Sequence, residues 1–244
     1  MELSGQTALI TGAARRIGRA LALALADQGM NVVVHHRHSA ADAERLCAEI
    51  AERGVRAWPV SADLDDLNAV STLVDRAMTR AGSLFVLVNN ASRFAPDDID
   101  KVTFDAIAEN VRINAWAPLA LSRAFAIRAG KGRIINLLDS KIAGGDSSHV
   151  SYLLSKQMLA AITRMTALEL APHVTVNAVA PGVILPPAGE DDAYIERLGA
   201  GVPLRRHGTT QDIADAVVFL ARSEFVTGQT IWVDGGAHLT QAEA

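Results

Sequence analysis

Cysteine is almost absent from this chain, which has one among its 244 residues, Cys47. A lone cysteine forms no internal disulfide, so we expect a reducing, cytoplasmic location. Long apolar runs are also missing, since none approaches the ~20 residues that a helix needs to span a membrane. We predict the first strand within about ten residues of Met1, too close to the start to leave room for a signal peptide. The sequence therefore predicts a cytoplasmic protein without a membrane partner.

Charge of one sign is not concentrated anywhere either. Lys and Arg number 23 and Asp and Glu number 27, which gives a net charge of -4 without a basic block. This balance argues against nucleic acid as a partner. Hydrophobic residues make up 50% of the chain, enough for a sizeable core, and no linker, repeat or low-complexity tract divides it. We therefore expect one domain over residues 1–244.

Apolar runs alternate with helical patterns along the whole chain. Strands are predicted at 7–10, 31–34, 56–60, 84–88, 134–138, 174–179 and 230–233. Helices are predicted from the first glycine turn to residue 29 and at 40–53, 67–81, 104–129, 151–171 and 210–221. Such alternation produces right-handed crossovers and a parallel sheet. The predicted class is α/β: a single-domain Rossmann fold with a doubly wound, mostly parallel sheet of about seven strands and helices on both faces.

A glycine turn follows the first predicted strand. Gly12 permits a tight turn, and Gly18 lets the next helix approach the strand closely. Backbone N–H groups and the helix dipole favour a pyrophosphate at such a place. Arg16 stands at the middle position, which is usually glycine. A turn so poor in glycine also fits a purely structural role, but its place after the first strand favours nucleotide binding by Gly12, Arg16, Ile17 and Gly18.

The end of the second strand predicts the type of nucleotide. An acidic residue there would bind the ribose 2′-hydroxyl of NAD, whereas basic and hydroxyl groups accommodate the 2′-phosphate of NADP. The chain has His35, Arg37, His38 and Ser39 at this place and no acid before Asp42. We therefore predict NADP(H); the alternative is a solvated polar loop. After the third strand, Asp63 and Leu64 are placed to meet the adenine.

Tyr152 and Lys156 are four residues apart in a predicted helix, so both side chains leave one face. An ammonium close to a phenol lowers the pKa of the tyrosine, which makes a usable proton donor. Asp139 follows the strand before this helix, at the sheet edge where α/β proteins bind ligands. A Tyr–Lys pair also occurs by chance in many helices, and Asn114, inside the long helix 104–129, fits a packing or kink residue equally well.

These motifs together resemble the short-chain dehydrogenase/reductase family over nearly the whole chain. The resemblance rests on Thr11-Gly12…Gly18, Asp63-Leu64, Asn89-Asn90-Ala91, Asn114, Tyr152…Lys156, Pro181-Gly182, Val226-Thr227-Gly228 and Val233-Asp234-Gly235-Gly236. It implies that Asn114, Tyr152 and Lys156 are catalytic. It also implies contacts with the cofactor by Asn90, Ala91, Ser92, Tyr152, Lys156, Pro181, Gly182 and Val183. No metal ligands are implied.

Three departures from the common family pattern resemble the pteridine reductase branch. They are Asp139 where serine is usual, and Arg16 and Ser92 where glycine is usual. The segment His35–Ser39 is similar to that branch as well, and so is Phe94, whose counterpart stacks a pterin against the nicotinamide. The resemblance thus implies substrate binding by Arg16, Ser92, Phe94, Asp139 and Tyr152. Gln241 stands where some members have an arginine that reaches a neighbouring subunit's site.

The chemistry of Asp139 agrees with this branch. A serine hydroxyl donates a hydrogen bond to a carbonyl oxygen that gains negative charge, whereas an ionised carboxylate only accepts and would repel that oxygen. Asp139 suits a ligand rich in N–H groups, such as a dihydropterin or dihydrofolate. A carboxylate near Tyr152 also opposes Lys156 and tends to keep the phenol protonated. Reduction of a C=N bond needs such an acid.

Three functions remain open on the sequence: an NADPH-dependent pteridine reductase, a 3-oxoacyl or sugar-alcohol reductase of the same fold, and a nucleotide-sensing protein that binds NADP without turnover. Segment 183–202, rich in proline, glycine and acidic residues, is a candidate substrate lid. The helices around Asn114 and Tyr152 carry more apolar residues than one sheet covers: Met158, Leu159, Ile162, Trp116, Leu119 and Leu121. These fit either a core or an interface, and the resemblance implies a homotetramer.

Overall fold

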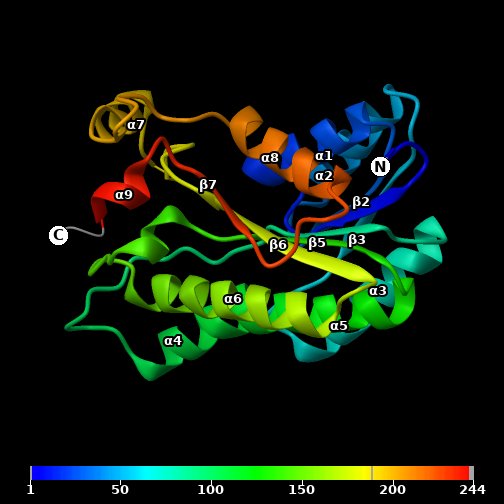
Figure 1. Cartoon of the computed structure of the whole chain (residues 1–244), viewed down its shortest axis with the longest axis horizontal. Coiled ribbons are helices and arrows are strands. Elements are labelled where there is room, and N and C mark those ends of the chain that lie inside the picture. The colour runs from blue at the N-terminus through cyan, green and yellow to red at the C-terminus, as the bar shows by residue number, and fades with distance from the viewer. Residues whose placement is uncertain (1, 188, 242–244) are drawn as a thin grey trace.

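The computed structural model of the chain describes residues 2–187 and 189–241, which form one α/β fold around a central sheet (Figure 1). The sheet has seven strands in the order β3-β2-β1-β4-β5-β6-β7, and every strand pairing in the described residues is parallel. The strands are β1 Thr7–Ile10, β2 Asn31–His36, β3 Ala57–Ser61, β4 Val86–Asn89, β5 Gly132–Leu137, β6 Val174–Pro181 and β7 Thr230–Val233. The predicted fold class is confirmed.

Helices cover both faces of the sheet. One layer consists of α1 Arg16–Asp27, α2 Ala40–Ala51 and α8 Thr210–Arg222 (upper side of Figure 1). The other consists of α3 Leu67–Ala81, α4 Phe104–Val111, α5 Ala117–Ala129 and α6 Val150–Glu169. Strands β1, β2, β4 and β5 are buried along their whole length, because helices lie against both faces of a parallel sheet. Their near-continuous apolar runs are the sequence signature of that burial.

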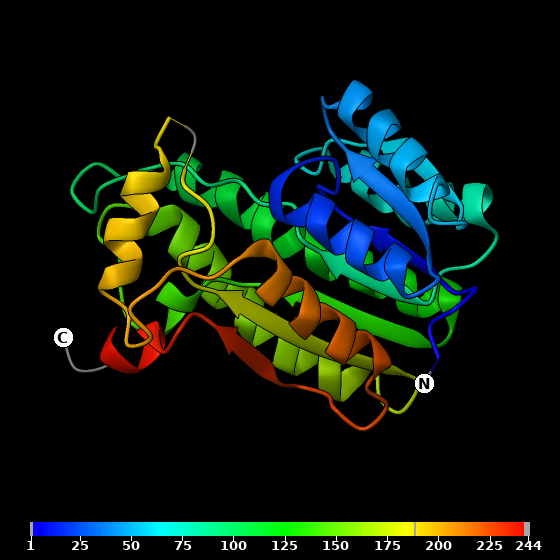
Figure 2. The ribbon, with the colours of Figure 1, turned by 90° about the horizontal axis from the view of Figure 1, so that it is seen from above.

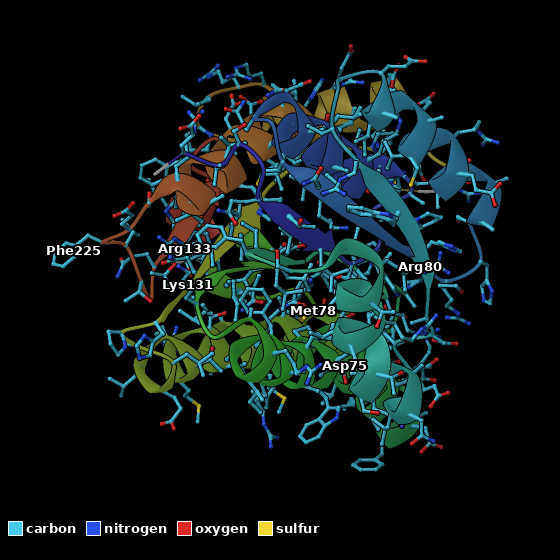
Figure 3. The ribbon with its side chains drawn as sticks, turned by 90° about the vertical axis from the view of Figure 1, so that its right-hand side faces the viewer. Asp75, Met78, Arg80, Lys131, Arg133 and Phe225 are labelled. Carbon is cyan, nitrogen blue, oxygen red and sulfur yellow. The ribbon has the colours of Figure 1, made fainter. Side chains whose placement is uncertain are left out.

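The two ends of the sheet differ. The short helices α7 Asp192–Ala200 and α9 Ala237–Gln241 lie together at the end where the strands finish (Figures 1 and 2). Figure 3 looks at the opposite end, where Lys131 and Arg133 mark the start of β5. No helix among residues 2–187 and 189–241 combines the length and apolarity that crossing a membrane demands.

Several element bounds shift by one or more residues, and three differences from the predicted elements bear on the site. The second strand runs on to His36, so His35 is a strand residue and not part of a loop. The predicted helix 104–129 is interrupted by a π-helical turn, Arg112–Trp116, which contains Asn114. Pro118 follows this turn and has no N–H to donate to the Asn114 carbonyl, which favours the local widening. The predicted lid 183–202 contains helix α7; Ala188 within that segment lies outside the described residues.

Candidate active site

The glycine turn after β1 is locked against the end of β4. The backbone N–H groups of Asn90 and Ala91 both donate to Thr11 Oγ1 at 3.0 Å, and Asn90 Nδ2 donates to the Thr11 carbonyl at 2.8 Å. Gly12 has a φ of +63°, and a Cβ there would lie 3.0 Å from Ala91 Cα. A Cβ on Gly18 would lie 2.2 Å from the Gly12 carbonyl oxygen. Both glycines are therefore required by geometry, as predicted for a turn that takes a pyrophosphate.

Arg16 adopts a left-handed backbone conformation, with a φ of +53°. This explains why glycine is usual there, since a residue with a Cβ is strained at positive φ. The Arg16 guanidinium donates to the carbonyl oxygen of Pro186 at 2.7 Å. Arg16 thus joins the glycine turn to the segment after β6 that is the predicted lid. The structure brings these two predicted parts of the site together.

His35 lies behind the glycine turn and is 2% exposed. Its Nδ1 accepts from the Gly12 N–H at 3.0 Å, so Nε2 carries the hydrogen and donates to the Ala62 carbonyl at 3.1 Å. Burial lowers the pKa of His35 from 6.5 to about 4, which keeps the ring neutral. Because both ring nitrogens are used within the fold, the His35 side chain has no free donor for a 2′-phosphate, which corrects its predicted role. Sequence reasoning could not distinguish these roles.

A hollow of about 210 Å³ lies beside the glycine turn. Its lining is Gly12, His35, Arg37, Ala62, Asp63, Leu64, Ala91, Ser92, Arg93 and Ile113. Seven of these residues are ones that the sequence predicts for cofactor binding. The Arg37 guanidinium pairs with Asp63 at 3.1 Å across the ends of β2 and β3. The cradle, the hollow and these donors fit the adenosine half of a dinucleotide.

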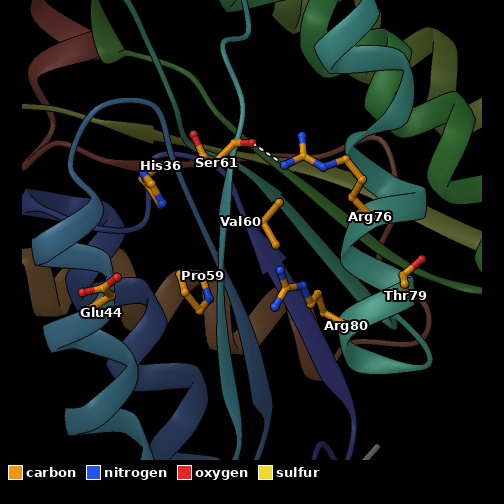
Figure 4. Close-up of a pocket in the computed structure, with 8 residues that line it drawn as sticks. All are labelled: His36, Glu44, Pro59, Val60, Ser61, Arg76, Thr79 and Arg80. Atoms are coloured by element: carbon orange, nitrogen blue, oxygen red, sulfur yellow. Dashed lines mark hydrogen bonds between the residues drawn. The ribbon is translucent and has the colours of Figure 1, made fainter.

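A larger hollow of about 450 Å³ lies elsewhere, at the edge of the sheet (Figure 4). Strand β3 lines the middle of this hollow, with Glu44 of α2 on one side of the strand and Arg76 and Arg80 of α3 on the other (Figure 4). Arg76 donates to the outward carbonyl of Ser61 at 2.8 Å, and Pro59 offers no N–H. Such features protect an exposed strand edge from pairing. This groove holds none of the predicted site residues.

At the ends of β5 and α6 the predicted catalytic side chains meet. Tyr152 Oη donates to Asp139 Oδ2 at 2.8 Å, and Asp139 Oδ1 accepts from the Lys141 N–H at 2.9 Å. Lys156 Nζ donates to the Leu137 carbonyl at 2.6 Å and lies 5.7 Å from the centre of the Tyr152 ring. Tyr152 and Lys156 are both buried. The helix therefore presents the pair on one face, as their spacing predicts.

The electrostatics correct one prediction. Burial raises the pKa of Tyr152 well above its usual range, and the negative charge of Asp139 and the hydrogen bond to it raise the pKa further. The expected lowering of this pKa by Lys156 is wrong, because the phenol's hydrogen-bond partner is the carboxylate and not the ammonium. Burial lowers the pKa of Lys156 to about 8, an effect that Asp139 opposes. The phenol is therefore a protonated donor at neutral pH.

Asn114 is fully buried in the π-helical turn. Its Oδ1 accepts from the Arg93 N–H at 2.8 Å and the Ser92 hydroxyl at 3.2 Å. Its Nδ2 donates to Ser155 Oγ at 2.9 Å, next to Lys156 in the chain. Asn114 thus ties the loop after β4 to the helix of Tyr152. The sequence reasoning missed Ser155, whose signal is its place directly before the lysine.

Phe94 is not a core residue: its side chain is 48% exposed. Its ring meets Tyr152 edge to face, with centroids 4.7 Å apart and planes at 87°. It also stacks on His149, at 4.4 Å and 12°. Phe94 therefore stands beside the Tyr152–Asp139 pair. His149 was missed because it lies in a loop far from Phe94 in the sequence.

The fold, the glycine turn and the Tyr152–Lys156 helix define a class of NAD(P)-dependent oxidoreductases. The family model described as enoyl-(acyl carrier protein) reductase matches residues 12–238. The chain belongs to the short-chain dehydrogenase/reductase family.

Its relatives carry different substrate names. The 3-oxoacyl-[acyl-carrier-protein] reductase FabG of Staphylococcus aureus is 35% identical, over 96% of this chain and 98% of that protein. Pteridine reductase 1 of Leishmania tarentolae is 34% identical, over 96% of this chain and 97% of that protein. The crystal structure of FolM alternative dihydrofolate reductase 1 from Brucella canis, complexed with NADP, matches with a TM-score of 0.91 and 32% identity, covering 98% of this chain and 96% of that chain. The pteridine branch is not singled out by these matches.

Proposed function

We propose that this protein is an NADPH-dependent pteridine reductase that converts a dihydropterin or dihydrofolate to its tetrahydro form. The observation that supports it most is the 2.8 Å hydrogen bond from Tyr152 to Asp139. A carboxylate at this place accepts N–H groups of a pterin and repels the oxyanion that forms from a ketone. Phe94, exposed and beside Tyr152, offers a planar ligand a stacking surface.

The proposed cofactor is NADP(H), which the solved FolM structures from Brucella canis and Brucella suis contain. Gly12 and Gly18 form the pyrophosphate turn, and Arg37, His38 and Ser39 hold the 2′-phosphate. When bound, NADPH supplies the hydride, which goes to a C=N carbon of the pterin ring. The side chains of Lys156 and Asn90 and the segment Pro181–Val183 complete the nicotinamide side of the site.

In the proposed mechanism Tyr152 gives its proton to the ring nitrogen next to the carbon that takes the hydride. Its raised pKa keeps the phenol protonated until the substrate binds and makes the phenolate left by the transfer take up a proton again readily. Asp139 accepts hydrogen bonds from the N–H groups of the pterin and so orients the ring. After the proton transfer, Asp139 passes a proton from solvent to Tyr152 Oη. Lys156, with a pKa of about 8, is mostly protonated at neutral pH. Its positive charge stabilises the Asp139 carboxylate and the phenolate that Tyr152 becomes after it gives up its proton. Asn114 fixes the loop of Ser92 and Phe94 against this helix.

A 3-oxoacyl reductase is the second candidate, because FabG of Staphylococcus aureus is as similar, at 35% identity, as pteridine reductase 1 at 34%. Asp139 is its difficulty. The third candidate, an NADP-binding protein without turnover, is opposed by the intact constellation of Asn114, Tyr152 and Lys156.

One assay distinguishes the three. The purified protein is incubated with NADPH and either dihydrobiopterin or an acetoacetyl thioester, and NADPH oxidation is followed by absorbance. We expect kcat/KM for dihydrobiopterin to exceed that for the thioester. A ratio below one would move the chain to the carbonyl-reducing branch, and NADPH binding without oxidation would support the regulatory candidate.

We also propose a homotetramer, a lid at residues 183–202 and a cytoplasmic location. Of the apolar residues that fit either a core or an interface, Leu121, Leu159 and Ile162 lie in the core and Leu119 is partly buried against it, whereas Trp116 and Met158 are exposed. Like Met158, Met165 and Leu168 are exposed residues of α6. Phe225 projects from the molecule at the end where the strands begin (Figure 3). Light scattering at micromolar concentration tests the tetramer, and a monomeric mass would rule it out.

A further inference from the structure

We infer that His149, held in place by Asp146, is a positioning residue that fixes the Phe94 ring for stacking on the substrate. The inference rests on the proposed function, since it concerns how that site binds a planar ring. The His149 and Phe94 rings lie nearly parallel, 4.4 Å apart and inclined by 12°. The Phe94 ring also meets Tyr152 edge to face. An exposed phenylalanine is thus held between a second ring and the proton donor.

Asp146 fixes the orientation of the His149 ring. Its Oδ2 accepts from His149 Nδ1 at 2.9 Å and from the Lys141 ammonium. Its Oδ1 accepts from the Ser148 N–H at 2.9 Å and the Ser148 hydroxyl at 2.5 Å. Burial works to raise the pKa of Asp146, but the hydrogen bonds from Lys141 and Ser148 outweigh it and hold the pKa far below its usual value. An ionised Asp146 requires the hydrogen on His149 Nδ1, so the imidazole cannot turn over freely.

The two loops that carry these rings are joined by their backbones. The Asp97 N–H donates to the Ser148 carbonyl at 3.0 Å, and the Ser151 N–H donates to Asp97 Oδ1 at 3.1 Å. A further bond runs from the Val150 N–H to the Asp97 carbonyl at 3.3 Å. Phe94 is three residues before Asp97, and His149 lies between Ser148 and Val150. These bonds therefore set the register that places one ring over the other.

The consequence is pre-organisation of the stacking surface. With His149 in place, the Phe94 ring is fixed before the substrate arrives, and binding does not have to immobilise it. Without His149, an exposed ring on a loop has to be ordered by each substrate molecule. This cost falls on substrate binding and not on proton or hydride transfer, because Tyr152 is held by Asp139, and Lys156 by the Leu137 carbonyl, without His149.

The test compares five variants in pterin reduction. His149→Ala removes the ring and its anchor, His149→Phe keeps a ring without the anchor, His149→Gln keeps a donor without the ring, and His173→Ala is the control on an exposed loop. We expect His149→Ala and His149→Gln to raise KM for dihydrobiopterin about two- to tenfold with kcat little changed. His149→Phe should restore most of the loss, and NADPH affinity should be the same in all variants. Asp146→Asn should lie between the unaltered protein and His149→Ala.

The outcomes separate this inference from the proposed function. An unaltered protein that reduces dihydrobiopterin, with a KM that none of the His149 variants changes, would overturn the positioning role alone. So would a His149→Phe variant as poor as His149→Ala, since the ring would then not be what matters. An unaltered protein that favours the acetoacetyl thioester would overturn both. Thermal melting of each variant shows whether it is folded. If His149→Ala is unfolded, Asp146→Asn takes its place in the test.

Discussion

The cofactor side and the substrate side of this site are built differently. On the cofactor side, hydrogen bonds between side chains and backbone groups join Thr11, Gly12 and Asn90, and a buried His35 ties the turn to the loop after β3. On the substrate side, single side chains on loops make the surface, and Phe94 is 48% exposed. The first arrangement is part of the scaffold of the fold, whereas loop side chains on a scaffold are where function is set.

The difference explains why the comparisons define the class but not the substrate. FabG of Staphylococcus aureus and pteridine reductase 1 of Leishmania tarentolae are equally similar to this chain, at 35% and 34% identity. Overall identity counts every aligned position alike, whether or not it lies near the substrate. Under the proposed function, the choice between a ketone and a pterin depends on a few positions, among them Asp139, which accepts the hydrogen bond of Tyr152.

The largest effect is expected from Tyr152→Phe, which removes the proton donor and leaves the cofactor side untouched. General acid catalysis is typically worth ~10²–10⁴-fold, so kcat should fall by that range. NADPH affinity, measured by titration of its fluorescence, should stay nearly the same. A loss of less than tenfold would mean that Tyr152 is not the donor.

Low pH should destabilise the folded protein through protonation of His35 on the cofactor side. The pKa of His35 is lowered from 6.5 to about 4 in the folded protein, so the unfolded state binds the extra proton more readily. The contribution of neutral His35 to the free energy of unfolding is fully present above pH 6.5. It is lost as the pH falls from 6.5 towards 4, by up to about 3 kcal/mol. Urea unfolding at a series of pH values should display this slope. His35→Gln should lack it, and an unchanged slope in that variant would contradict the account.

Two glycines give a matched contrast between the sides. Gly18→Ala places a Cβ 2.2 Å from the Gly12 carbonyl oxygen, whereas a Cβ on Gly145 has nothing within 4 Å. Gly18→Ala should cost about 1–3 kcal/mol of unfolding free energy, the usual cost of overpacking. It should weaken NADPH binding as well, while Gly145→Ala should be close to neutral in both. Equal effects of the two substitutions on the thermal midpoint would refute the close approach.

The smallest effect concerns the choice of cofactor. Arg37→Asp puts a carboxylate beside the predicted 2′-phosphate, and loss of one charge-assisted contact should lower the preference for NADPH over NADH about tenfold. Steady-state kinetics with both cofactors measure this ratio, and Arg56→Asp on the approach to β3 is the control. Equal efficiency with NADPH and NADH in the unaltered protein would remove the basis of the prediction.

The sequence predicted the sheet well because each buried parallel strand is an apolar run. The bounds of β1, α3 and β7 agree with those predicted. Properties that depend on contacts between distant segments were not predictable. The direction of the His35 ring, the π-helical turn around Asn114 and the stack of His149 on Phe94 all depend on packing of segments far apart in the chain. The predicted lowering of the Tyr152 pKa by Lys156 was wrong for the same reason, since Asp139 and not Lys156 receives the phenol's hydrogen bond.

The central claim is that the carboxylate of Asp139 selects a pterin over a ketone. It is tested most directly by kcat/KM for dihydrobiopterin and for an acetoacetyl thioester in the unaltered protein and in Asp139→Ser. The account predicts that the substitution lowers the pterin value about tenfold or more, as expected for a lost hydrogen bond to a charged group. The thioester value should stay equal or rise, because serine donates to the oxyanion. A parallel fall of both values, or an unchanged pterin value, would contradict the claim.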